Sequence, residues 1–172
     1  MIIGNAGGGK STLACALSKA HDLPLTELDT LIWKPGWTPV SEAEFRPRHE
    51  QAMAGARWVI DGYGPWWSVL DRLQAADTII LIDLPFPIHM WRVLKRQAAS
   101  LFSSTHDGPA GCPRWRVTFK LLPMMWKLHR TSRPKLLEAI EQQRGHARII
   151  KLTTPDQLDR ALNKIQNIQT AT

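Results

Sequence analysis

The stretch Gly4-Asn5-Ala6-Gly7-Gly8-Gly9-Lys10-Ser11 decides the class of this chain, because it fits the pattern G-x-x-x-x-G-K-[ST] at every fixed position. Glycines let backbone N–H groups converge on phosphate oxygens, and a helix that begins here adds its N-terminal partial positive charge. We expect Lys10 to reach the β- and γ-phosphates and Ser11 to hold Mg²⁺. The predicted cofactors are ATP and Mg²⁺, bound by Gly4, Asn5, Ala6, Gly7, Gly8, Gly9, Lys10, Ser11 and Thr12.

Length and composition indicate one domain. The 172 residues, of which 44% are hydrophobic, suffice for a single packed core. The longest apolar stretch, residues 78–82, is far too short to cross a bilayer. We therefore expect a cytoplasmic protein without a membrane partner. The two cysteines, Cys15 and Cys112, form no metal-ligand pattern.

The net charge of +7 raises the question of a nucleic-acid partner. The basic residues concentrate between Arg92 and Arg148, and a small anionic substrate explains that clustering as well as nucleic acid does. The sequence contains no helix-turn-helix pattern and no zinc finger. A small-molecule phosphate acceptor is therefore the expected partner, nucleic acid ranks below it, and no pattern indicates an oligomeric state.

Strand and helix patterns alternate along the chain. Strands are expected at residues 1–3, 23–28, 57–62, 77–84 and 147–152, with helical patterns between them. Ser41 and Glu44 form a capping box at the start of one helix, and Thr154 precedes Pro155 at the start of another. This order predicts an α/β fold of the P-loop NTPase type: three layers, α/β/α, around a five-stranded parallel sheet with its site at the carboxyl edge.

A small helical lid is expected within the single domain of residues 1–172. From residue 101 to 113 the pattern breaks into Ser, Thr, Gly, Pro and Cys, and a segment rich in basic and large apolar residues follows. We interpret residues 97–130 as a lid insertion that closes over the transferring phosphate.

Three aspartates are candidates for chemistry. Asp83, at the end of a predicted strand, is an alternative to Asp61 as the holder of Mg²⁺-bound water. Asp61 ends a predicted strand and could hold Mg²⁺ through a water molecule, with a turn or cap role as the alternative. Asp29 ends the second predicted strand and could accept a proton from a hydroxyl acceptor. If the acceptor is a phosphate, no base is needed, and Asp29 would only orient the substrate.

Arginines and tryptophans complete the predicted site. Arg92 and Arg96 lie four residues apart, so one helix face can direct both guanidinium groups at a phosphate-filled cleft. A solvated basic surface is the alternative interpretation for this pair and for the arginine pair Arg130 and Arg133. The second arginine pair and two loop tryptophans are expected to bind the acceptor: Arg130, Arg133, Trp33 and Trp37. The tryptophans could instead cap the core.

The chain resembles the adenylate-kinase-like branch of the P-loop kinases, and more closely the bacterial adenylate-kinase-related or DNA-topology-modulation proteins. The resemblance spans nearly the whole sequence, through the matching segments 3–14, 28–37, 58–63, 91–96 and 133–134. It implies that Asp61 and Gly62 form the strand end where the aspartate assists Mg²⁺ binding, and that Arg92 and Arg96 open the lid.

One departure from that family concerns the acceptor. Adenylate kinases follow Asp-Gly with an aromatic residue, a proline and an arginine that grips the acceptor phosphate. This chain has Tyr63-Gly64-Pro65-Trp66 and no arginine until Arg72. The closer group also shows an asparagine between Gly and Tyr that is absent here. The departure counts against AMP as the acceptor.

The sequence thus favours Mg²⁺- and ATP-dependent phosphoryl transfer to a nucleoside or nucleoside monophosphate, with Lys10, Arg92 and Arg96 stabilising the transition state and Asp29 as candidate base. Two alternatives stay open. One is a regulatory ATPase that acts through a macromolecular partner such as DNA. The other is a kinase of a sugar or other small alcohol.

Overall fold

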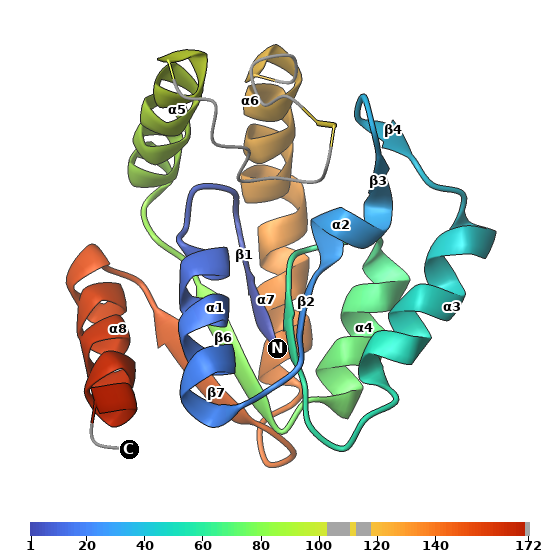
Figure 1. Ribbon diagram of the computed structural model, residues 1–172, viewed down its shortest axis with the longest axis vertical. Coiled ribbons are helices and arrows are strands. Elements are labelled where there is room, and N and C mark those ends of the chain that lie inside the picture. The colour runs from blue at the N-terminus through green and yellow to red at the C-terminus, as the bar shows by residue number, and fades with distance from the viewer. Residues whose placement is uncertain (103–110, 113–117, 171–172) are drawn as a thin grey trace.

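The computed structural model describes residues 1–102, 111–112 and 118–170. At its centre lies a parallel sheet of five strands in the order β2-β5-β1-β6-β7, with helices on both faces (Figure 1). The prediction of a five-stranded parallel sheet is confirmed. Its strands are β1 (Ile2–Gly4), β2 (Leu25–Glu27), β5 (Val59–Asp61), β6 (Thr78–Ile82) and β7 (Arg148–Leu152).

The helices account for most of the remaining described chain. None of those that the structure describes is both long and apolar enough to cross a membrane. They are α1 (Lys10–His21), α2 (Leu28–Ile32), α3 (Glu42–Met53), α4 (Trp66–Ala75), α5 (Phe86–Phe102), α6 (Thr118–Lys127), the π-helical segment η2 (Leu128–Ser132), α7 (Arg133–Glu141) and α8 (Pro155–Thr170).

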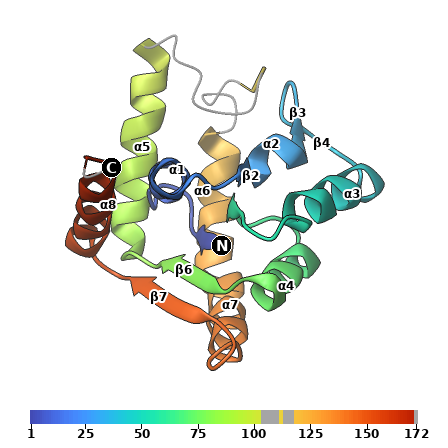
Figure 2. The same ribbon diagram turned by 60° about the horizontal axis from the view of Figure 1, so that its bottom comes forward.

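Alternation along the strands divides the core into two halves. Ile2, Ile80 and Ile82 pack with residues of α1 and α8 on one face of the sheet. Ile3 and Leu81, one residue out of phase, pack with α4 and α7 on the other face. The views in Figures 1 and 2 show these two helical layers on opposite sides of the strands. The predicted three-layer α/β/α arrangement is confirmed.

The strand order places the glycine-rich loop of residues 4–11, the predicted phosphate loop, at the switch point of the sheet. β1 lies between β5 and β6, and all three run parallel. The chain leaves β1 through the loop into α1. The connections that follow β5 and β6 then lead to opposite faces of the sheet. Ligands of open parallel sheets bind at this point of the carboxyl edge.

Segment boundaries differ from the sequence predictions around β2. This strand ends at Glu27, so Asp29 lies in the first turn of α2 rather than at a strand end. The region of Trp33 and Trp37, expected to be loop, forms a two-stranded antiparallel hairpin of β3 (Trp33–Lys34) and β4 (Thr38–Pro39). Strands of two residues leave no alternating pattern that sequence reading could detect.

The described parts of the predicted lid region are helical except for Gly111 and Cys112. Residues 97–102 belong to α5, and residues 118–127 form α6. The helix then continues through η2 into α7 without a break in the chain. The rest of the 97–130 insertion, residues 103–110 and 113–117, lies outside the described residues, and its role as a lid stays a prediction.

A third hydrophobic cluster lies beneath α2 and the β3–β4 hairpin, at the part of the sheet's carboxyl edge that we call the acceptor side. Leu28, Phe45 and Ile60 form its buried centre. The capping box predicted at the start of α3 is present, because the backbone N–H of Glu44 donates to Ser41 Oγ at 3.3 Å and the Ser41 N–H donates to the Glu44 carboxylate at 3.2 Å. The predicted cap of α8 also forms, with Gln157 N–H donating to Thr154 Oγ1 at 3.3 Å.

His49 is buried in this cluster and is expected to make stability depend on pH. Burial, reinforced by the charge of Arg72, lowers the pKa of His49 to about 4. The folded state thus binds fewer protons than the unfolded state between pH 6.5 and 4. This contribution to stability is present above pH 6.5 and is lost as the pH falls through that window.

We expect His49→Leu to remove this part of the pH dependence. Wild type should lose about 1–2 kcal/mol more unfolding free energy between pH 7 and 4 than the variant does. Urea denaturation at pH 7, 6, 5 and 4 measures the difference. Parallel curves for the two proteins would contradict the assignment.

Candidate active site

The phosphate loop passes so close to its neighbours that side chains are excluded. Gly7 has φ +73°, and a Cβ atom there would lie 2.7 Å from the carbonyl oxygen of His89. Gly9 has φ +88° and caps the start of α1 in the left-handed conformation. The loop can therefore adopt this course only with glycine at these positions.

Two side chains hold the loop between α5 and α6. The amide of Asn5 donates through Nδ2 to the carbonyl of Met125 in α6 at 3.1 Å, and its Oδ1 accepts from the N–H of Ala6 at 2.9 Å. On the other side, Nδ1 of His89 in α5 lies 2.9 Å from the carbonyl oxygen of Ala6. The loop is thus fixed to both helices through a single dipeptide.

His89 is a neutral donor in this contact. Its side chain is buried, and burial, assisted by the charges of Lys10 and Arg92, lowers the pKa of His89 below its ordinary value. Because a carbonyl oxygen can only accept, the proton must lie on Nδ1. Sequence reading did not identify His89, since nothing near it in the chain marks it as a neighbour of Ala6.

Positive charge lies along the loop. The ammonium of Lys10 donates to the carbonyl of Asn5 at 3.1 Å, so this side chain lies across the loop. A Cβ atom on Gly9 would lie 3.8 Å from a guanidinium nitrogen of Arg92, which places that predicted arginine beside the loop. Arg96, one turn further along α5, is exposed.

Ser11 and Asp61 meet at the start of α1. The Ser11 hydroxyl donates to Asp61 Oδ2 at 2.6 Å, although 50 residues separate them. Asp61 is buried, and its Oδ1 has no hydrogen-bond partner within the part of the chain that the structure describes. Mg²⁺ is commonly held by one or two carboxylates together with waters and phosphate oxygens. A hydroxyl, a carboxylate and a buried oxygen without a partner fit such a site.

Arg72 is a second residue that sequence reading did not assign. Its side chain is fully buried, yet its guanidinium contacts backbone carbonyls rather than a carboxylate. Nε–H donates to Ser68 O at 2.9 Å, Nη1–H donates to Gly62 O at 2.9 Å, and Nη2–H donates to Tyr63 O. Arg72 therefore holds the turn that follows Asp61, and this engagement leaves it no free face for an acceptor phosphate.

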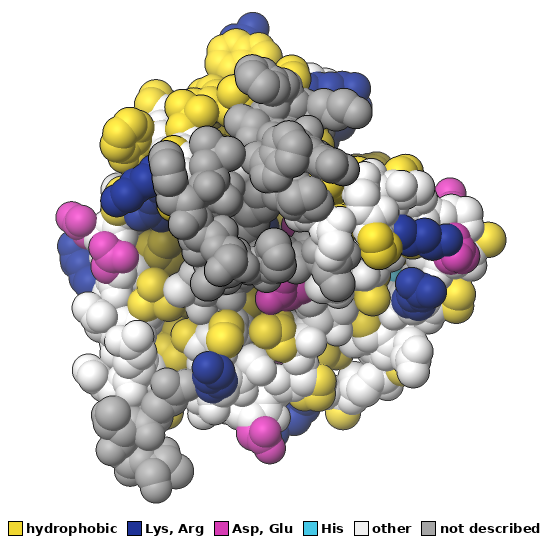
Figure 3. Space-filling model, turned by 45° about the horizontal axis from the view of Figure 1, so that its top comes forward, with side chains coloured by type: hydrophobic (Ala, Val, Ile, Leu, Met, Phe, Trp, Pro, Cys, Tyr) yellow, Lys and Arg dark blue, Asp and Glu magenta, His cyan; other side chains and the backbone are white. Residues whose placement is uncertain are grey.

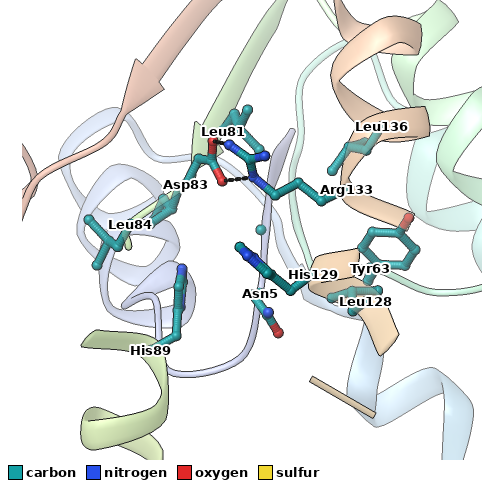
Figure 4. Close-up of a pocket in the computed structure, with 12 residues that line it drawn as sticks. Asn5, Tyr63, Leu81, Asp83, Leu84, His89, Leu128, His129, Arg133 and Leu136 are labelled. Atoms are coloured by element: carbon teal, nitrogen blue, oxygen red, sulfur yellow. Dashed lines mark hydrogen bonds and ion pairs between the residues drawn. The ribbon is translucent and has the colours of Figure 1, made fainter. Parts of the chain in front are cut away.

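Arg133 is engaged by Asp83. Two parallel hydrogen bonds, Nε to Oδ1 at 2.6 Å and Nη2 to Oδ2 at 2.7 Å, join α7 to the end of β6, and this pairing raises the pKa of Arg133. Figure 4 shows the pair in a pocket beside the loop, together with Asn5, His89 and His129. The structure thus brings Arg133 to the candidate site.

Arg130 lies apart from the Asp83–Arg133 pair. It is exposed on η2, with its guanidinium 5.6 Å from the ring centre of Trp126.

The other predicted acceptor residues, Asp29, Trp33 and Trp37, lie in α2 and in the β3–β4 hairpin. Asp29 is exposed on α2. Trp33 and Trp37 pack edge to face in the hairpin, with ring centres 5.7 Å apart. Gly62 has φ +128° and passes against Leu28, the residue before Asp29.

Residues 111–112 of the insertion contact this hairpin. The N–H of Gly36 donates to Gly111 O at 2.8 Å, and the Cys112 thiol donates to Lys34 O at 3.2 Å. The hairpin therefore connects the acceptor side to the described part of the insertion.

Figure 3 looks onto this end of the molecule. Hydrophobic side chains gather over the region of α5 and α6, with lysine and arginine side chains beside them. Among the side chains of these two helices that the structure describes, the large apolar ones that are exposed are Trp91, Leu94, Met124 and Trp126.

Comparison with known proteins gives a likeness of fold. No protein-family model matches the chain, and no curated protein matches it. Among solved structures, the chain is similar to the unliganded crystal structure of a sugar kinase from Janibacter sp. HTCC2649. The two share 18% sequence identity with a TM-score of 0.52, and the match covers 99% of this chain and 94% of that chain. At this identity the likeness shows that the fold is shared with a kinase.

We expect Gly7→Ala to damage the loop through contact as well as strain. The new Cβ would meet the backbone of α5, so the variant should lose about 1–3 kcal/mol of stability and most of its nucleotide affinity. Gly145→Ala is the matched control, because Gly145 has φ +92° but no atom lies within 4 Å of the point where its Cβ would stand. Thermal unfolding and calorimetric nucleotide titration compare the two. Equal losses in both would mean that contact with α5 is unimportant.

Proposed function

We propose that this protein transfers the γ-phosphoryl group of ATP, with Mg²⁺, to a hydroxyl group of a small acceptor. The observation that carries the proposal is the contact between Ser11 and Asp61 beside the glycine loop. It supplies, in one place, the two protein groups that phosphoryl transfer requires for its metal. The shared fold with a sugar kinase supports the proposal, because that neighbour also bears a kinase name.

The donor side has residues for each part of the transfer. The loop N–H groups and Lys10 would bind the β- and γ-phosphates, and Arg92 lies where it could face the transferring group. Ser11 would contact Mg²⁺ directly, and Asp61 would contact it through water. When bound, Mg²⁺ would neutralise charge that develops on the phosphate oxygens. Arg96 and Arg130 are exposed, and their contribution stays a prediction.

Charges on the acceptor side favour an uncharged acceptor over a nucleoside monophosphate. Lys34 is paired with Glu44 at 2.8 Å, and Arg46 is paired with Glu42 at 2.7 Å. Arg72 is bound to backbone carbonyls. Within the described ranges, these cations of the acceptor side are thus already engaged, whereas a phosphate acceptor would need a free one.

Asp29 is the proposed base for such an acceptor. As the acceptor oxygen bonds to the γ-phosphorus, its proton would pass to the Asp29 carboxylate and the bond to the ADP oxygen would break. Trp33 and Trp37 would supply apolar faces against a sugar ring or a nucleobase. A nucleoside, a sugar or another small alcohol meets these requirements.

The test of the proposal is ADP release from Mg²⁺·ATP across a panel of nucleosides, nucleoside monophosphates, sugars and small alcohols, with an acceptor-free control. Strong stimulation by one hydroxyl compound supports the proposal and names the substrate class. Stimulation by nucleoside monophosphates alone would overturn the choice of acceptor. A slow rate that no acceptor changes would favour a regulatory ATPase, and binding to DNA at physiological salt would then be measured.

We expect Lys10→Ala to reduce phosphoryl transfer by at least about 10²–10³-fold, because a cation at the transferring phosphate is lost. The fold should persist, since Lys10 bonds only to a carbonyl of the loop among the interactions described. Lys19→Ala, an exposed lysine in the last turn of the same helix, is the control and should retain full rate. Full activity of Lys10→Ala would exclude the proposed mechanism.

Asp29→Asn should separate hydroxyl transfer from phosphate transfer. The amide cannot take up the proton, so the rate with a hydroxyl acceptor should fall by about 10²-fold or more while ATP affinity is retained. Transfer to a phosphate acceptor, if there is any, should change only modestly. Steady-state kinetics with the best acceptor measures this, and an unchanged kcat would remove Asp29 from the role of base.

A further inference from the structure

Arg72 carries an inference that deepens the proposed function and rests on it. The residue lies in α4, eleven positions after Asp61, and no pattern in the sequence connects the two. Nevertheless the Arg72 guanidinium is bound to the backbone on the carboxyl side of Asp61. Arg72 is thus connected to Asp61, a proposed Mg²⁺ ligand, through the backbone of Gly62 and Tyr63.

The turn after Asp61 depends on contacts at both ends of the segment that carries its two glycines. Gly62 and Gly64 both have positive φ, at +128° and +73°, so the backbone here is intrinsically free to move. The Gly62 N–H reaches Ile2 O at 3.3 Å on one side. On the other side, Arg72 binds the carbonyls of Gly62 and Tyr63 and anchors them to Ser68 O in α4.

This anchoring determines where the Asp61 carboxylate points. Asp61 is the last residue of β5, and its Oδ2 must stay within hydrogen-bond distance of Ser11 Oγ on α1. A shift of the peptide that follows Asp61 would rotate the carboxylate. Oδ2 would then move away from Ser11, and Oδ1 would leave its buried position. Misplacement of about 1 Å at a catalytic group is enough to cost two orders of magnitude in rate.

Charge supports the same role. The Arg72 side chain is 0% exposed, and a buried charge is tolerated when its hydrogen bonds are satisfied. Burial lowers the pKa of Arg72 to about 10, and the charge of Asp61, followed by that of Asp71, acts against this shift. Arg72 is therefore still a cation at neutral pH and interacts electrostatically with the metal-site carboxylate without bonding to it.

We propose that Arg72 is the positioning residue of the Mg²⁺ site: by binding the carbonyls of Gly62 and Tyr63, it holds the Asp61 carboxylate toward Ser11 in the orientation that accepts Mg²⁺-bound water. It acts on the metal and not on the nucleotide phosphates. Nucleotide binding without metal should therefore not depend on Arg72, whereas the gain in affinity that Mg²⁺ brings should.

Two substitutions test this. Arg72→Lys keeps the charge but loses the planar set of donors, and Arg72→Gln keeps one donor but loses the charge. Arg57→Lys is the matched control, since Arg57 is an exposed arginine that also donates to a backbone carbonyl, that of His21 at 3.2 Å. Each protein is checked by circular dichroism and assayed at a temperature where it is folded.

The readout is the affinity for a non-hydrolysable ATP analogue, measured by calorimetry with excess EDTA and then across a Mg²⁺ titration. In both Arg72 variants we expect the affinity for the analogue in EDTA to stay within about twofold of the wild-type value. The half-saturating Mg²⁺ concentration should rise about tenfold or more. Arg57→Lys should match wild type in both. The proposal would be overturned if either folded Arg72 variant showed the same half-saturating Mg²⁺ concentration as wild type. An equal loss of analogue affinity with and without Mg²⁺ would also overturn it.

If neither variant folds, hydrogen exchange of the wild type gives the answer. Mg²⁺ added to the bound analogue should protect the amides of residues 62–64 more than those of residues 73–76 at the end of α4. Equal protection of both segments would overturn the proposal. Failure of the proposed function is distinguishable, because a wild type that phosphorylates no acceptor could still show Mg²⁺ affinity that depends on Arg72.

Discussion

The close approach of β1 to β6 is the constraint on which the rest of the site depends. A Cβ atom at Gly4 would lie 2.2 Å from the carbonyl oxygen of Ile82, its register partner on β6. Only glycine can occupy that point, and the chain then turns directly into the phosphate loop. The positions of Lys10 and Ser11 follow from this exit, because α1 begins at Lys10 as soon as the loop ends.

Sequence reading identified the features that depend on local pattern. The loop motif, the five strands and the caps at Ser41 and Thr154 each occupy a few consecutive residues, and the structure contains all of them. The parallel order of the sheet followed from alternation of strand and helix. Boundaries differed more, and Asp29 lies in a helix rather than at a strand end because β2 ends at Glu27, one residue before the predicted end of the strand.

The residues that organise the site from a distance could not be found in this way. His89 meets Ala6 across 83 residues. Arg133 was predicted as a site residue, but its partner Asp83, 50 residues away, was not. Arg72 is closer in sequence, but its partners are backbone carbonyls, which leave no mark on side-chain composition. A histidine or arginine in an amphipathic helix is most often a surface residue. Burial, which only the folded structure reveals, distinguishes His89 and Arg72 from that common case.

Two aspartates at the ends of the strands that flank β1 illustrate how differently one residue type can be used. Asp83 is bound directly by both donor nitrogens of Arg133, so its two oxygens are engaged in an ion pair. Asp61 has an arginine nearby as well, but Arg72 binds the carbonyls of the next turn, and Oδ1 of Asp61 keeps no partner within the described residues. A direct pair would have occupied the oxygens that a metal-bound water needs. An arginine that acts through the backbone instead keeps the carboxylate in place and leaves it available for binding.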